Sequence, residues 1–171
     1  MHSIAFWPIV VVLAIATITD LRDRRIPNWL VLPCLLAGIV VSGCHEGWHG
    51  LGQSVAGLAL GLLLYGAIFL LGGMGMGDVK LCGALGAWIG PHQLLLALVV
   101  TGIAGGIMAV CWAAADGFLA DMFRNTGDLI FGIWKRGLHR HPELVLDNPK
   151  ARKMPYAPAI AIGTLLSFFV R

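Results

Sequence analysis

The sequence predicts an all-α polytopic membrane protein in which about six helices cross the bilayer. Of its 171 residues, 58% are hydrophobic and only 12% are charged, about half the charged fraction of a typical soluble domain. The apolar residues form long unbroken runs, and inside a bilayer only helices or closed barrels satisfy the backbone hydrogen bonds. The runs lack the alternation of polar and apolar residues that barrel strands show, so we expect helices.

Six apolar segments are the expected spans. They are residues 4–19, 29–43, 51–71, 79–89, 94–115 and 155–170. A spanning helix usually needs about 20 residues. The third and fifth segments meet that length, whereas the first, second and sixth are slightly short. The fourth is the shortest, and a re-entrant segment or a buried core helix are the alternatives to a crossing. Three GxxxG spacings, at 57–61, 86–90 and 102–106, predict close helix contacts.

The basic residues favour six crossings with both termini outside. Lys and Arg concentrate in the cytoplasmic loops of membrane proteins. Six crossings place 11 of the 12 basic residues on one side and only Arg171 on the other. Without a crossing by the fourth segment, loop 116–154 and its seven basic residues would lie outside. We therefore expect one membrane-embedded domain over residues 1–171, with loop 116–154 in the cytoplasm between spans five and six.

Loop 116–154 is the one sizeable polar segment. Its residues 122–137 mix aromatic and aliphatic side chains with basic ones, a pattern typical of a helix in the membrane interface. A solvated connector is the other interpretation. The chain has no basic face with interleaved aromatic residues. We therefore expect the lipid bilayer, and not nucleic acid, as its partner.

Two aspartates at the cytoplasmic edge are the candidate functional residues. Asp20 ends the first span in "TDLRDRRIPN", and Asp78 opens the fourth in "GMGDVK". Ionisable residues at membrane depth are costly, so a functional role is the default expectation. Two carboxyls in a low-dielectric site do not readily both ionise, so one can activate water while the other holds a proton. Asp23, between two arginines, is instead interpreted as a solvated charge.

The residues beside Asp78 are predicted to contact a substrate. Gly75 and Gly77 lack a side chain and let another backbone approach closely. Lys80 lies two residues beyond Asp78, where its ammonium group is placed to bind substrate, to pair with a carboxylate or to reach towards lipid headgroups.

The order of these motifs resembles the prepilin peptidases, which are aspartic proteases of the membrane. An Asp is followed after five residues by Ile-Pro-Asn, then by GxGD-Val-Lys-Leu, and finally by Pro-Tyr-Ala-Pro at 155–158. The pattern is most similar to the short branch that serves adhesion-pilus and tight-adherence secretion. The resemblance implies that Asp20 and Asp78 are the catalytic pair and that a GxGD active-site loop faces the cytoplasm from the bacterial inner membrane.

The resemblance also implies a substrate class. Pilin or pseudopilin precursors would be cut after a short basic leader, before their hydrophobic helix. Neither a metal nor an organic cofactor is implied. Larger relatives also methylate the new amino terminus through a cysteine-rich domain. This chain has no paired CxxC motifs, so methyltransferase activity is not expected.

Two alternative functions stay open. "HEGWH" at 45–49 matches HExxH, which on a helix presents two histidines to zinc and a glutamate as base. Asp147 would be its distant third ligand. Glycines at 43, 47 and 50, and a position on the external side, argue against this zinc protease. The other alternative is a non-enzymatic transport or assembly subunit, because intramembrane carboxylates also relay protons. The oligomeric state is not predicted.

Overall fold

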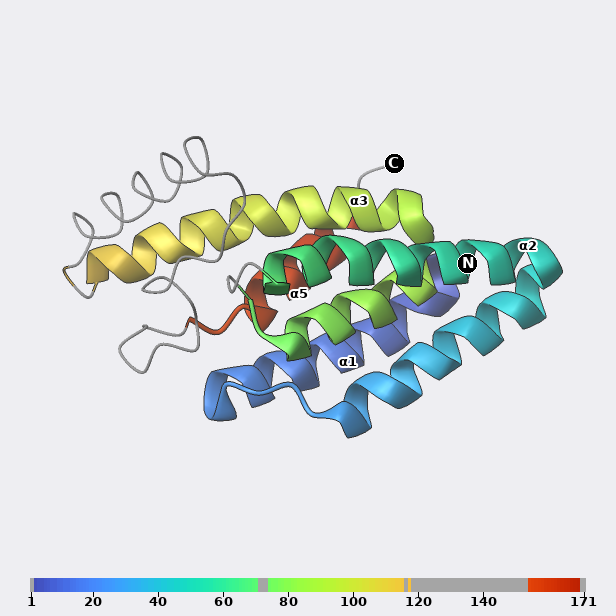
Figure 1. Ribbon diagram of the computed structural model, residues 1–171, viewed down its shortest axis with the longest axis horizontal. Helices are drawn as coiled ribbons and strands as arrows, with labels where there is room; N and C mark the ends of the chain where they lie inside the picture. The colour runs from blue at the N-terminus through green and yellow to red at the C-terminus, as the bar shows by residue number, and fades with distance from the viewer. Residues whose placement is uncertain (1, 71–73, 116, 118–153, 170–171) are drawn as a thin grey trace.

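The computed structural model describes residues 2–70, 74–115, 117 and 154–169, which fold entirely as helices and short connections (Figure 1). The helices are α1 (His2–Asp23), α2 (Asn28–Leu70), α3 (Met76–Ala115) and α5 (Ala157–Ser167). Three of them, α1, α2 and α3, are long and apolar enough to cross a membrane, and α5 is a shorter apolar helix. The predicted all-α membrane class is confirmed for this part of the chain. Most of loop 116–154, with its predicted interfacial helix and Asp147, lies outside the described residues.

Helices α2 and α3 each fold back on themselves at a single glycine. Gly47 has φ 58° and ψ −138°, and Gly90 has φ 73° and ψ 173°. Glycine adopts positive φ without the steric cost that a side chain would add. Pro91 follows Gly90, and proline is well tolerated where a helix begins. The described chain therefore contains six straight helical segments, one for each predicted span. Their number of membrane crossings stays a prediction.

The short fourth segment forms the centre of the bundle. Residues 81–88 are all buried, and α3 packs mainly against α2 and α5. Leu81 and Leu85 of α3 join Ile9 and Leu13 of α1 in one core cluster. The segment is thus buried within the bundle, and its crossing of the membrane stays a prediction. Large apolar side chains remain exposed on the outer faces, such as Leu63 at 71%, as lipid contact requires.

Backbone contacts between helices explain some of the GxxxG spacings. A Cβ atom on Gly57 would overlap the carbonyl oxygen of Gly86, and one on Gly86 would overlap that of Gly57. Gly61 lies against the carbonyl of Cys82 in the same way. Close approach through small residues is a common way for helices to associate in membranes. The third spacing is different, because Gly102 and Gly106 have open space beside them within the described residues.

Candidate active site

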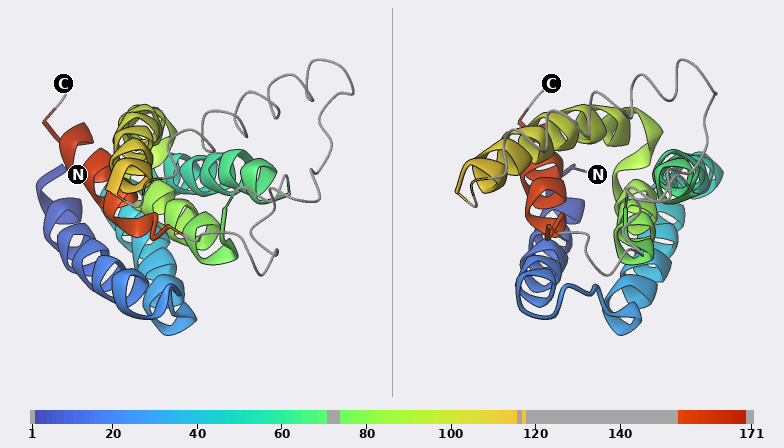
Figure 2. Two further views of the ribbon diagram at one scale, coloured as in Figure 1. Left: turned by 90° about the vertical axis from the view of Figure 1, so that its left-hand side faces the viewer. Right: turned by 60° about the vertical axis from the view of Figure 1, so that its left-hand side comes forward.

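Three helix ends meet at one end of the bundle. The carboxyl end of α1, the amino end of α3 and the amino end of α5 all lie towards the left-hand side in Figure 1, and the views of Figure 2 also bring them together. These ends carry Asp20, Asp78 and Ala157, which are far apart in the sequence. The three segments that the sequence analysis singled out are therefore neighbours in the fold.

Asp20 lies in the last turn of α1 and is only 7% exposed. The helix ends just beyond it, where Arg24 takes φ 51° and donates its backbone N–H to the Asp20 carbonyl at 2.9 Å. The side-chain Oδ2 of Asp20 accepts a hydrogen bond from the backbone N–H of Ala157, also at 2.9 Å. A buried carboxyl group is costly without such a partner. The first residue of α5 thus holds one oxygen of Asp20 in place.

Asp78 lies in the first turn of α3, three residues after Gly75. The GxGD motif predicts a glycine loop at this position, but Gly77 and Asp78 are already helical. The backbone of Gly75 hydrogen-bonds the Asp78 carboxylate, and a Cβ on Gly75 would lie 3.3 Å from Oδ2. An acidic side chain that reaches back to the start of its helix is half of a capping box. The other oxygen, Oδ1, is buried without a hydrogen-bond partner among the described residues.

The two carboxyls form a pair. Asp20 and Asp78 interact electrostatically, because α1 and α3 bring the two side chains to the same end of the bundle. Each carboxyl also accepts a backbone hydrogen bond. Asp20 accepts one from Ala157 of α5, and Asp78 accepts one from Gly75, just before α3. The site therefore contains two carboxyls that are each held by a backbone hydrogen bond. One buried oxygen, Oδ1 of Asp78, accepts no hydrogen bond from any described group.

Two further contacts join the predicted motifs. The space beside Gly77 is filled by Ile26, whose Cβ would lie 3.1 Å from a Cβ on Gly77. Lys80 donates from Nζ to Oδ1 of Asn28 at 3.2 Å. Ile26, in the connection between α1 and α2, and Asn28, the first residue of α2, thus contact the start of α3 on both sides of Asp78. Substrate binding by Gly75, Gly77 and Lys80 stays a prediction.

A buried polar cluster lies next to Asp78 and was not identified from the sequence. Tyr65 of α2 hydrogen-bonds both Cys82 and Thr101 of α3. Tyr156, just before α5, interacts electrostatically with Asp78 and Cys82. Tyr156 was quoted as part of a motif, but neither tyrosine was given a role. Residues this far apart in sequence carry no signal of their proximity.

The geometry does not assemble a zinc site at 45–49. Gly47 breaks the helix between the two histidines, so they do not share the helix face that HExxH needs. His45, Glu46 and His49 are all exposed. Across the described ranges, no group of three or more His, Cys, Asp or Glu residues is placed to hold a metal ion. This segment also lies at the opposite end of the bundle from the aspartates.

Comparison with known families agrees with the motif order. The model of the type IV leader peptidase family matches residues 7–110. The chain belongs to this family. Asp20 and Asp78 both lie inside the matched region, whereas Ala157 lies beyond it. The predicted family is therefore confirmed.

Curated members of the family share the name prepilin leader peptidase/N-methyltransferase. The protein from Aeromonas hydrophila is 38% identical over 106 residues, which are 58% of this chain and 36% of the relative. The one from Escherichia coli (strain K12) is 32% identical over 127 residues, 69% of this chain and 52% of the relative. The one from Bacillus subtilis (strain 168) is 28% identical over 174 residues, 97% of this chain and 56% of the relative. The chain thus spans between about a third and just over half of these leader peptidases. No solved structure matches it.

Proposed function

We propose that the protein is an aspartic endopeptidase of the bacterial inner membrane, which removes the short basic leader from pilin or pseudopilin precursors at the cytoplasmic membrane edge. The observation that carries the proposal is the pairing of Asp20 and Asp78 at one end of the bundle. Membership of the type IV leader peptidase family supports the reaction class.

The chemistry follows from the pair. Two adjacent carboxyls share a proton because two neighbouring negative charges in a buried site repel each other. The ionised carboxyl removes a proton from water as the water attacks the peptide carbonyl, and the protonated one donates to the developing product. Ala157 fixes the orientation of Asp20, while Oδ1 of Asp78, which is buried without a hydrogen-bond partner among the described residues, is the oxygen that we propose binds the attacking water. No step requires a metal or an organic cofactor.

The surrounding residues suit a peptide substrate at this edge. Gly75 adds no side chain beside Asp78, so a substrate backbone can approach the carboxyls from that side. Gly77 admits Ile26 and so keeps the connection between α1 and α2 against the site. Lys80, which donates a hydrogen bond to Asn28, contributes a positive charge beside the aspartates. We propose that these three residues shape substrate entry and that leader cleavage, without methylation, is the activity of this chain.

Co-expression with candidate pilin precursors tests this function. We expect a size shift on a gel, and sequencing of the mature amino terminus should place the cut close to the start of the hydrophobic helix, after a small residue. A cut deep inside that helix, or on the external side, would contradict the proposed position of the site. Precursors that stay uncut, in cells whose ion gradients depend on the protein, would support the transport subunit instead.

The proposed orientation gives a separate topology prediction. Because 11 of the 12 basic residues fall on one side of six crossings, a reporter fused within residues 116–154 should report the cytoplasm. A reporter fused at 45–49 should report the exterior. Enzymatic reporters that are active on only one side of the membrane make this measurement. A cytoplasmic signal at His49 would exclude six crossings with both termini outside.

A further inference from the structure

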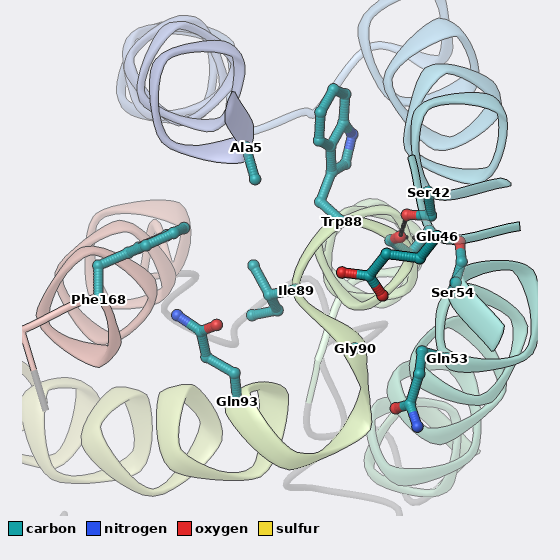
Figure 3. A pocket seen from close by; sticks show the side chains of 12 residues that line it. Ala5, Ser42, Glu46, Gln53, Ser54, Trp88, Ile89, Gly90, Gln93 and Phe168 are labelled. Carbon is teal, nitrogen blue, oxygen red and sulfur yellow. Dashed lines mark hydrogen bonds between the residues drawn. The ribbon is translucent and has the colours of Figure 1, made fainter. Parts of the chain in front are cut away.

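A cavity of about 200 Å³ lies at the end of the bundle opposite the aspartates, where α2 and α3 fold back. It is beside Gly90 and close to the fold-back at Gly47 (Figure 3). Its volume corresponds to roughly six or seven water molecules at about 30 Å³ each. Ala5, Ile89 and Phe168 form part of an apolar wall. The catalytic proposal makes no use of this space.

Several polar groups around the cavity present hydrogen-bond acceptors, and the amide of Gln53 has both an oxygen acceptor and N–H donors. Ser42 and Ser54 both donate their hydroxyl hydrogens to the Ala87 carbonyl, at 3.4 and 2.8 Å, so their oxygens can only accept further bonds. Gln93 donates from Nε2 to the Ser167 carbonyl at 3.4 Å. That bond uses one of the two amide N–H groups and leaves the amide oxygen of Gln93 free to accept a further bond, and Figure 3 shows this oxygen turned towards the cavity.

Glu46 adds a negative charge to this lining. Its carboxylate points into the cavity from α2, towards the side that Gln93 occupies on α3 (Figure 3). No Lys, Arg or His lines the cavity among the described residues. An anion would be repelled by Glu46. A divalent metal ion prefers several carboxylate or carbonyl ligands, and this lining holds a single carboxylate.

We propose that this cavity binds a primary ammonium group. An ammonium group has a positive charge and three N–H donors, which match a carboxylate, an amide oxygen and hydroxyl oxygens. The position favours the headgroup of an aminophospholipid as the source, because the cavity lies where two apolar helices turn back and is partly walled by apolar side chains. A free soluble amine shares the same chemistry. The inference does not depend on the proposed protease activity.

Competition between two lipids tests the proposal. The purified full chain is offered equal amounts of phosphatidylethanolamine and phosphatidylcholine with identical acyl chains, and bound lipid is counted by native mass spectrometry. The two headgroups carry the same net charge, but only ethanolamine has N–H donors. We expect preferential retention of the ethanolamine lipid. Glu46→Gln should weaken that preference about tenfold or more, because a charged hydrogen-bond partner is lost. Asp23→Asn removes an exposed carboxylate at the other end of the bundle and should leave the preference unchanged.

Two outcomes would overturn the proposal. They are equal retention of the two lipids by the unmodified chain together with no Glu46-dependent rise in Tm on addition of free ethanolamine, and a Glu46→Gln preference equal to that of the unmodified chain. Thermal unfolding with added free ethanolamine separates the two sources. A Glu46-dependent rise in Tm at millimolar ethanolamine, without lipid preference, would assign the site to a soluble amine. Lipid preference without such a rise would assign it to the aminophospholipid. Glu46 is exposed and glutamine has the same shape, so loss of folding is not expected to obscure the result.

Discussion

Asp20→Asn and Asp78→Asn should each reduce leader removal by about 10²–10⁴-fold, the usual contribution of one general acid or base. Asparagine keeps nearly the shape of the side chain, and its amide oxygen can still accept the backbone hydrogen bonds from Ala157 or Gly75. What is lost is proton exchange between the two carboxyls. The measurement is the processed fraction of a co-expressed precursor, with the membrane level of each variant determined by immunoblot.

Matched controls separate this result from general damage. Asp23→Asn, three residues from Asp20 but exposed, should process normally. His49→Ala and metal chelators should also leave processing intact, because Gly47 interrupts the helix between the histidines. An inactive His49→Ala together with an active Asp78→Asn would move the active site to residues 45–49.

Gly163→Val should reduce processing by about 10–100-fold, because it acts on the orientation of Asp20 through α5. A Cβ on Gly163 would lie 2.6 Å from both the Ala97 carbonyl oxygen and the Thr101 backbone nitrogen of α3. These are backbone atoms, so α5 must move as a unit and take the Ala157 N–H away from Asp20. Misplacing a catalytic group by about 1 Å can cost a factor of 10². The processed fraction of the precursor is measured per amount of folded protein. Thermal unfolding is measured in parallel, and the free energy of unfolding should also fall by about 1–3 kcal/mol because the substitution overpacks the contact between α5 and α3.

Gly102→Val is the control for this substitution. Gly102 is also helical, and it neighbours Thr101, but the described residues leave open space where its Cβ would lie. The change in intrinsic helix propensity is the same at both positions. Gly102→Val should therefore process like the unmodified chain. Equal activity of the two variants would show that contact between α5 and α3 does not control the aspartate pair.

The helices were predictable, and the turns between them were not. An unbroken apolar run marks each of the six helical segments, because side chains that face lipid or the protein core are both apolar. The polar residues 44–50 looked like a loop, yet they are helical on both sides of Gly47. A single glycine at positive φ turns the chain there, and the sequence does not reveal which of several neighbouring glycines takes that conformation.

The site was partly predictable for a related reason. Asp20 and Asp78 were predicted because ionisable side chains are energetically unfavourable at membrane depth, and because the motifs resemble those of the family. The donor to Asp20 is a backbone N–H of an alanine, and every residue except proline has such a group, so no side chain marks it. Lys80 was predicted to bind substrate, and its bond to Asn28 depends on two helices whose packing the sequence does not show. The Glu46 cavity likewise depends on tertiary structure.

The hydrogen bond between Ala157 and Asp20 has a consequence for synthesis. Its two residues are 137 positions apart, and domains generally form from the amino terminus as the ribosome proceeds. A nascent chain that has passed α3 already contains both carboxyls, but the amide that orients Asp20 has not yet been made. A translation product that stops before α5 therefore contains both aspartates but lacks the hydrogen bond to Asp20. We therefore expect the proposed proteolytic activity to appear only after the ribosome has completed α5.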